Sequence, residues 1–253
     1  MEYPRVLIAF GVKDEAHTLP KYLEQIDKLD YPEDKLGYAV VTSPSSDNTV
    51  DIVLDWLKKK KHAYWQHVDV SHVEPLRRRM FTSTNYIRHY ILNDFPNTPR
   101  FDYMFQCDGD VIGIPPETLK TLIGLDVDIV APYIYTSMEK HPRNRFRNHK
   151  TFRDVWGFRF KYGPHPGLQF NSGVPEYYKR NMDTVDSIKA DRERGIIPMM
   201  SVGANPILIK REVLENVRYD GLHATPGWCI EADRLGYGVW SYPALECVHD
   251  WRS

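Results

Sequence analysis

Two aspartates, Asp108 and Asp110, directly follow an apolar stretch that spans residues 101–107. Apolar residues in this pattern predict a buried strand, and a Pro-Pro pair a few residues later predicts the start of a helix. Because open α/β sheets bind ligands outside the carboxyl ends of their strands, the aspartates lie where a ligand crevice is expected. In an extended segment the side chains at i and i+2 point to the same side, so both carboxylates are expected to face one cation, and Gly109 allows the backbone to bend. Hard oxygen ligands at this spacing favour Mg²⁺ or Mn²⁺ shared with a diphosphate.

The chain has 253 residues and a formal net charge of −1. This length suits one large α/β domain or two small ones, and the balanced charge gives no global affinity for a polyanion. The sequence has no apolar run of about twenty residues and no secretory signal at its start, so we expect a cytoplasmic protein without a transmembrane segment. Its cysteines, Cys107, Cys229 and Cys247, form no close-spaced metal pattern and cannot all pair, which agrees with a reducing compartment.

Strands and helices alternate through the first half of the chain. Between the apolar runs lie amphipathic segments such as 19–29, in which apolar residues recur at i, i+3, i+4 and i+7. This alternation predicts a mainly parallel sheet with right-handed crossovers, so that the loops after the strands meet at one edge. The predicted strands cover residues 5–10, 38–42, 63–70, 101–107 and 127–132, and the longest predicted helix covers 76–92.

The pattern changes after Pro132. Residues 133–178 are rich in Pro, Gly, Arg and aromatic residues, and a long irregular segment inside a compact domain is usually a lid or a binding loop. We therefore expect a mobile loop at about 140–178. Beyond it we expect short helices and strands, the last two strands at 237–242 and 245–249. The chain is expected to form one domain with two functional halves.

The order of these features resembles that of the GT-A nucleotide-sugar glycosyltransferases over nearly the whole chain. A polar turn with the pattern Ser-x-Asp-Asn-Thr follows the second strand, an arginine-bearing helix follows the third, and a late Gly-Tyr strand leads to a histidine. Within that superfamily, the motif at 108–111 and the Val-Ala-Pro at 130–132 look closest to the Anp1-type and related sugar transferases. The resemblance implies one GT-A-like, Rossmann-type α/β domain, 1–253, with a mainly parallel central sheet. Residues 1–132 then bind the nucleotide sugar, and residues 133–253 form a smaller, mixed acceptor-side half.

The resemblance implies a metal-dependent enzyme that transfers a hexose from a nucleoside-diphosphate sugar to a hydroxyl acceptor such as a glycan. Asp110 is then a direct ligand of Mn²⁺ or Mg²⁺, and Asp108 contacts the metal or the donor ribose. His249 matches the late histidine that often completes the metal site in such enzymes; an ordinary polar role near the chain end is the alternative. A cation at the donor stabilises the negative charge that develops on the leaving diphosphate.

Two strand ends are expected to hold the nucleoside of the donor. Relatives often have two acidic residues directly after the second strand, whereas this chain has Thr-Ser there. An acidic contact to the base is therefore missing unless Asp47 replaces it, and Asp47 is equally expected as a helix N-cap. The base, uridine or guanosine, stays open. The residues that the resemblance implies for this pocket are Ala9, Phe10, Gly11 and Lys13 on one side and Ser43, Ser45 and Asp47 on the other.

Three arginines open the predicted helix at 76–92, and a guanidinium group pairs bidentately with phosphate. They cannot all point one way on a helix, so we expect one of them, Arg79, to contact the donor, with Asn85 further along the helix. Trp156 is expected to stack on a sugar, with a position in the core as its alternative.

The catalytic base is less well defined than the metal ligands. Enzymes that invert the sugar configuration need a carboxylate before the late helix, where this chain has Ala224 and Thr225. His223, Glu231 and Asp233 are the nearest candidates, although the two acids could equally be solvent-facing helix residues. Otherwise the enzyme retains the sugar configuration and the departing phosphate helps to deprotonate the acceptor. The missing acid favours retention.

A basic stretch with interleaved aromatic residues covers residues 143–161. A lid over the donor or acceptor is the first interpretation, a solvated surface the second and a nucleic-acid acceptor site the last. Two further functions are alternatives to the transferase. A nucleotidyltransferase would need a Gly-rich phosphate loop after the first strand, and Gly11 alone is not one. A catalytically degenerate module that binds nucleotide sugar or nucleic acid would account for the missing base and the basic stretch.

Overall fold

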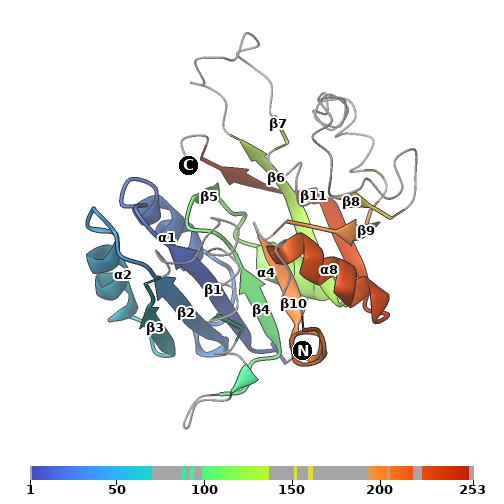
Figure 1. Ribbon diagram of the computed structural model, residues 1–253, viewed down its shortest axis with the longest axis horizontal. Coiled ribbons are helices and arrows are strands. Elements are labelled where there is room, and N and C mark those ends of the chain that lie inside the picture. The colour runs from blue at the N-terminus through green and yellow to red at the C-terminus, as the bar shows by residue number, and fades with distance from the viewer. Residues whose placement is uncertain are drawn as a thin grey trace.

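The computed structural model of the protein describes a central sheet and the helices that cover it (Figure 1). The described residues are 2–69, 87–88, 92–93, 99–136, 151–152, 159–161, 193, 195–203, 206–218 and 224–250. The predicted helix at 76–92 and the predicted loop at 140–178 therefore lie largely outside the described residues. No helix within these ranges is long and apolar enough to cross a membrane.

Strands and helices alternate in the first half, as predicted. These elements are β1 (Val6–Val12), α1 (Leu19–Asp27), the short 3-10 helix η1 (Glu33–Lys35), β2 (Leu36–Thr42), α2 (Thr49–Leu57), β3 (Ala63–His67), β4 (Tyr103–Gln106), β5 (Val111–Gly113), α4 (Thr118–Gly124) and β6 (Ile129–Thr136). The second half consists of β7 (Thr151–Phe152), β8 (Arg159–Phe160), β9 (Ile197–Ser201), β10 (Ile207–Lys210), α7 (Arg211–Asn216), α8 (Ala224–Arg234) and β11 (Val239–His249).

The described strands form one sheet in the order β3-β2-β1-β4-β10-β6-β11-β9-β8. The first four of these are mutually parallel, β10 runs antiparallel between β4 and β6, and β11 lies parallel to β6. The predicted α/β class is confirmed, while the antiparallel β10 strand within the sheet was not predicted. Because β1, β2, β4, β6 and β11 point the same way, their carboxyl ends share one edge of the sheet.

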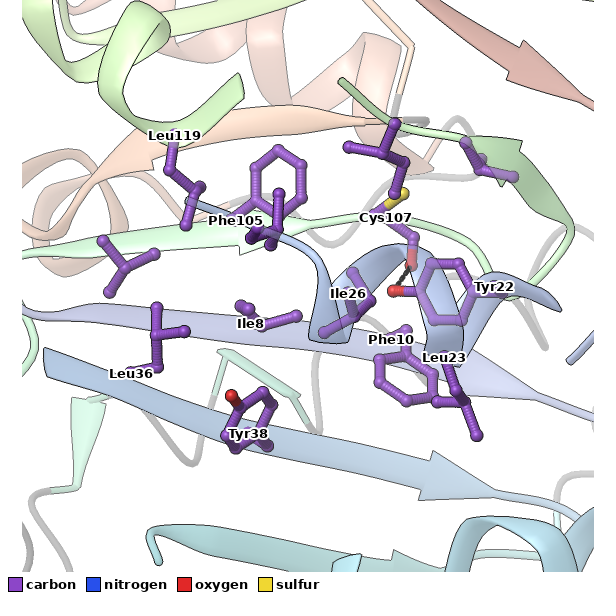
Figure 2. Packing of buried hydrophobic residues seen from close by; sticks show 14 of the residues in the cluster. Ile8, Phe10, Tyr22, Leu23, Ile26, Leu36, Tyr38, Phe105, Cys107 and Leu119 are labelled. Atoms are coloured by element: carbon purple, nitrogen blue, oxygen red, sulfur yellow. Dashed lines mark hydrogen bonds between the residues drawn. The ribbon is translucent and has the colours of Figure 1, made fainter. Parts of the chain in front are cut away.

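The core lies on both faces of the sheet. The β1 and β2 strands are almost entirely buried, which explains their continuous runs of apolar residues. On one face α1 packs through Leu19, Tyr22, Leu23 and Ile26, the amphipathic stripe that its sequence predicts (Figure 2). The Tyr22 hydroxyl also donates a hydrogen bond to the carbonyl oxygen of Cys107 at 3.1 Å, which ties α1 to the chain just beyond β4.

The β11 strand corrects one prediction. The segments 237–242 and 245–249, predicted as two strands, form one continuous strand whose pairing with β6 shifts in register between Tyr242 and Glu246. Pro243 lies within that shift, and a proline has no N–H with which to join the ladder, so the irregularity accommodates it. The far end of β11 pairs antiparallel with β5, where His249 lies opposite Val111 (Figure 1). The end of the chain thereby returns to the Asp-x-Asp motif.

Candidate active site

The Asp-x-Asp motif forms a tight turn between β4 and β5. The backbone N–H of Val111 donates to the carbonyl oxygen of Asp108 at 3.2 Å, so Gly109 and Asp110 are the two central residues of the turn. The expectation that the aspartates alternate along an extended strand is therefore corrected, because β4 ends at Gln106. Their predicted place at the carboxyl end of that strand is confirmed.

Gly109 allows this turn to pack against β1. A Cβ atom at this position would lie 2.5 Å from Cγ1 of Val12, which is closer than real Cβ contacts allow. The carboxyl end of β1 and the Asp-x-Asp turn are thus in direct contact. Steric contact with Val12, rather than a special backbone angle, accounts for the glycine at the centre of the motif.

Asp110 and His249 face each other across the β5–β11 pair. The imidazole Nε2 of His249 lies 2.8 Å from Oδ2 of Asp110, and the backbone N–H of Asp250 donates to the Asp110 carbonyl oxygen at 2.9 Å. The side chain of His249 is 3% exposed and that of Asp110 is 16% exposed, so bulk water screens the pair weakly. The structure brings these two predicted metal ligands together from opposite parts of the sequence.

The second ring nitrogen of His249 determines how the first can act. Nδ1 lies 2.5 Å from the carbonyl oxygen of Asp250, and because a carbonyl can only accept, Nδ1 carries the hydrogen. In a neutral imidazole Nε2 then presents its lone pair to the Asp110 carboxylate. Two acceptors at 2.8 Å repel unless a cation, either a proton on Nε2 or a metal ion, lies between them. An imidazole whose other nitrogen donates to a backbone carbonyl is the usual arrangement of a metal-binding histidine.

The other oxygen of Asp110 supports the same interpretation. Oδ1 is buried and has no hydrogen-bond partner within the described structure. Buried carboxylate oxygens are normally satisfied, so this atom is suited to a cation or a ligand. The donor set of one carboxylate and one imidazole therefore fits a divalent metal ion. Within the described ranges, no group of three or more His, Cys, Asp or Glu side chains is arranged to hold a metal by itself.

Asp108 lies at the first position of the turn and is half-buried. Burial raises the pKa of the Tyr22 phenol, and the charges of Asp108 and Asp110 raise it further. Tyr22 therefore keeps its proton and remains a hydrogen-bond donor to the Cys107 carbonyl.

Glu15, in the loop between β1 and α1, was not predicted as a site residue. Its Oε2 accepts a hydrogen bond from the Thr18 hydroxyl at 2.7 Å. Burial is the main cause that raises the pKa of Glu15; the Thr18 bond lowers it, the Asp110 charge raises it, and the charge of His249 lowers it. Glu15 is therefore within electrostatic reach of the Asp110–His249 pair. The convergence of loops at the carboxyl ends of parallel strands is the signal that could have identified it.

The residues predicted for the nucleoside pocket divide into two groups. The side chains of Ala9 and Phe10 are completely buried. In the core, the Phe10 ring packs against Tyr22 (Figure 2) and also against Trp56. Because β1 is covered on both faces, these side chains cannot contact a nucleoside, and a contact through the backbone of the two residues stays a prediction. Near the carboxyl end of β1, Gly11 is half-buried and Lys13 is exposed. These two residues lie closer to the ligand edge of the sheet.

On the β2 side of this pocket, Ser43 and Asp47 make contacts within the protein. Ser43 is buried, and its backbone N–H donates to the Val12 carbonyl oxygen at 3.3 Å. The Asp47 carboxylate accepts from the backbone N–H of Thr49, the first residue of α2, at 3.0 Å. The N-cap position of α2 is Asn48, so the alternative that Asp47 is the N-cap is corrected by one residue. A hydrogen bond from the Thr49 hydroxyl is the main cause that lowers the pKa of Asp47.

The predicted catalytic acids lie at the opposite edge of the sheet from Asp110 and His249. Glu231 forms an ion pair with Arg234 at 2.5 Å, and Asp233 forms one with Lys161. Both acids are near the end of α8, which leads into the start of β11, and His249 is at the other end of that strand (Figure 1). The structure therefore does not bring Glu231 or Asp233 to the metal ligands. The predicted site residues Arg79, Asn85, Trp156 and His223 lie outside the described residues.

The amino-acid sequence of the chain is similar to that of known glycosyltransferases. Residues 3–140 match the family model described as glycosyltransferase family 25, N-terminal domain. A glycosyltransferase 25 family member of Drosophila pseudoobscura pseudoobscura is 29% identical over 154 residues, which cover 52% of this chain and 23% of that protein. Human procollagen galactosyltransferase 2 is 29% identical over 144 residues, which cover 53% of this chain and 23% of that protein. The chain thus spans a minor part of the length of these curated relatives.

Solved structures extend the likeness to the whole fold. The mannosyltransferase PcManGT of Pyrobaculum calidifontis, in complex with GDP-Man and Mn²⁺, has a TM-score of 0.60 at 18% identity, covering 98% of this chain and 57% of that one. S. aureus TarS 1–349, in complex with UDP-GlcNAc, has a TM-score of 0.60 at 12% identity, covering 98% and 59%. The predicted GT-A-like fold is thereby confirmed.

Proposed function

The chain belongs to glycosyltransferase family 25, and we propose that it transfers a hexose from a nucleoside-diphosphate sugar to a hydroxyl acceptor with the help of a divalent cation. The observation that carries the proposal is the Asp110–His249 pair at 2.8 Å, together with the buried Oδ1 of Asp110, which no described residue hydrogen-bonds. The family match and the fold favour this function over a nucleotidyltransferase or a binding module without activity.

Asp110 and His249 would hold Mn²⁺ or Mg²⁺, with the remaining ligands supplied by the donor diphosphate and water. When bound, the cation supplies positive charge where the nucleoside diphosphate leaves. The hydrogen bond from Nδ1 of His249 to the Asp250 carbonyl fixes the ring with Nε2 toward Asp110, so that Nε2 would be available to hold the cation. Tyr22 holds the strand end before the turn through its bond to Cys107. Asp108 is proposed to contact the metal or the donor ribose.

The donor sugar is proposed by analogy with named relatives. One relative is named a procollagen galactosyltransferase, and one structural neighbour is titled a mannosyltransferase with GDP-Man. A hexose is common to both names, so UDP-galactose and GDP-mannose are the first donors to examine. Retention of the sugar configuration is part of the proposal, because the α8 acids lie at the other edge of the sheet.

A panel of nucleotide sugars tests this function directly. The protein is incubated with each donor and Mn²⁺, with and without simple sugar acceptors, and free nucleoside diphosphate is measured. Release from one donor, lost when the cation is chelated, is expected. Release of pyrophosphate would instead indicate a nucleotidyltransferase. Donor binding without release from any donor would contradict the transferase.

A further inference from the structure

We propose that the loops after β1 and β2 act as one clasped unit, in which Asp47 and Thr49 position the β1–α1 loop for donor binding without contacting the donor. We call the hydrogen bonds that join residues 14–16 to residues 45–49 the clasp. The clasp is seen in the structure, whereas its expected effect on the kinetics rests on the proposed function. It changes the role predicted for Asp47 from a donor ligand to a positioning residue.

The first part of the clasp is the Asp47 carboxylate. Its Oδ2 accepts a hydrogen bond from the backbone N–H of Ala16 at 3.0 Å, and its Oδ1 accepts from the backbone N–H of Thr49 at 3.0 Å. Ala16 belongs to the loop after β1, whereas Asp47 belongs to the loop after β2. One carboxylate therefore joins both loops through charge-assisted hydrogen bonds.

The second part is a relay through the Thr49 hydroxyl. The backbone N–H of Glu15 donates to Thr49 Oγ1 at 2.8 Å, and Oγ1 donates its own hydrogen to Oδ1 of Asp47 at 2.5 Å. A hydroxyl has one hydrogen and two lone pairs, so it can accept from one loop while it donates to the other. Thr49 is fully buried, so water cannot readily replace either bond.

The third part is Asp14, whose φ of 54° lies in the left-handed region. Its Oδ1 accepts from both the backbone N–H and the hydroxyl of Ser46, at 2.6 and 3.0 Å. Its own N–H donates to the Ser45 hydroxyl at 3.2 Å. Aspartate tolerates this backbone region better than most residues, and the three bonds to the β2 loop hold it there.

The clasp fixes the loop that carries Glu15. The Glu15 N–H is held by Thr49, its carbonyl accepts from the N–H groups of Thr18 and Leu19, and its carboxylate is held by the Thr18 hydroxyl. A loop ordered before binding spares the donor the cost of ordering it. Breaking the clasp is therefore expected to raise the donor KM and to leave kcat nearly unchanged.

Thr49→Val removes the hydroxyl with little change of shape, and Thr49→Ser retains it as a matched control. With the donor found in the panel, Thr49→Val is expected to raise the donor KM roughly tenfold, while kcat and the acceptor KM stay within about twofold. Thr49→Ser is expected to restore the KM. An unchanged donor KM in Thr49→Val, or an equal fall in kcat, would overturn the positioning role.

Amide hydrogen exchange tests the clasp independently of any activity. Exchange at Glu15 and Ala16 is expected to accelerate in Thr49→Val and to stay slow in Thr49→Ser. If no donor is turned over, faster exchange at these two amides still supports the clasp while the proposed function fails. Unchanged exchange in Thr49→Val would overturn the clasp itself. Should Thr49→Val not fold, Asp47→Asn, which removes one acceptor of the carboxylate, is measured in the same way.

Discussion

The end of α8 and the Asp-x-Asp turn both place carboxylates beside basic side chains, but the two regions differ in how many of the carboxylate oxygens have a partner. On α8, Glu231 uses both of its oxygens on Arg234, and Asp233 pairs with Lys161. At the Asp-x-Asp turn, Asp110 faces His249 with one oxygen, and its second, buried oxygen has no hydrogen bond to any of the residues that the structure describes. A completed ion pair near the surface contributes little and needs no further partner. The Asp110–His249 pair at the turn leaves a buried oxygen available, so a cation or a ligand is expected there.

Replacement of each kind of aspartate should separate the two regions most strongly. Asp110→Asn keeps the shape of the side chain but removes its charge, so metal-dependent turnover should fall by about a hundredfold or more. Asp233→Asn is the matched control and should change turnover by less than about twofold, since it breaks a partly buried ion pair away from the predicted metal ligands. Initial rates of nucleoside diphosphate release measure both. Similar losses in the two variants would contradict the contrast between the regions.

The contact between Gly109 of the turn and Val12 of β1 gives a second prediction, with a smaller expected effect, on the stability of the fold. Gly109→Ala places a methyl group where only 2.5 Å separates it from Val12, so unfolding should become easier by about 1–3 kcal/mol. Denaturant titration measures this loss. Because the clash involves one partner, adding Val12→Ala should recover part of the stability. Strictly additive losses in the double variant would argue against the contact.

Asp47 is a third carboxylate to compare: it is exposed, and both of its oxygens accept hydrogen bonds. Its replacement should have the smallest effect of the three. Its pKa is lowered from 3.8, chiefly by the Thr49 hydroxyl, so its contribution to stability is present above pH 3.8 and is lost as the pH falls through the lowered value. The difference in melting temperature between the wild type and Asp47→Asn should therefore narrow in acid. A difference that does not depend on pH would assign the effect to shape rather than to charge.

The sequence predicts the strands and the sheet edge at which the site lies, but not the details that depend on packing. Hydrophobic periodicity identified β1, β2 and β4 and their helices, and strand order along the chain placed Asp108 and Asp110 at the carboxyl edge. The resemblance to GT-A enzymes supplied His249. Periodicity could not reveal that Phe10 points into the core, since a strand covered on both faces has no exposed side. Nor could spacing show that the motif is a turn, because its geometry depends on the contact of Gly109 with β1.

The acids of α8 show that the sequence can also suggest site residues that the structure places elsewhere. Glu231 and Asp233 are predicted as candidates because similar enzymes have an acid just before this helix, where the chain has Ala224 and Thr225, and these two are the next acids along it. Their distance from the site follows from β11, which runs from the end of α8 to His249 as one strand and so separates the two. The sequence pattern does not predict Glu15, because the effect of the Asp110 charge on its pKa depends on how the two loops are placed in space.

Titration of Mn²⁺ into the protein in the presence of UDP or GDP, followed by calorimetry, tests the central claim most directly. The wild type should bind one Mn²⁺ per chain, and both His249→Ala and Asp110→Asn should weaken that binding by about 10- to 100-fold or abolish it, while Asp233→Asn should not. Equal Mn²⁺ affinity in all four proteins would show that the Asp110–His249 pair is not the metal site.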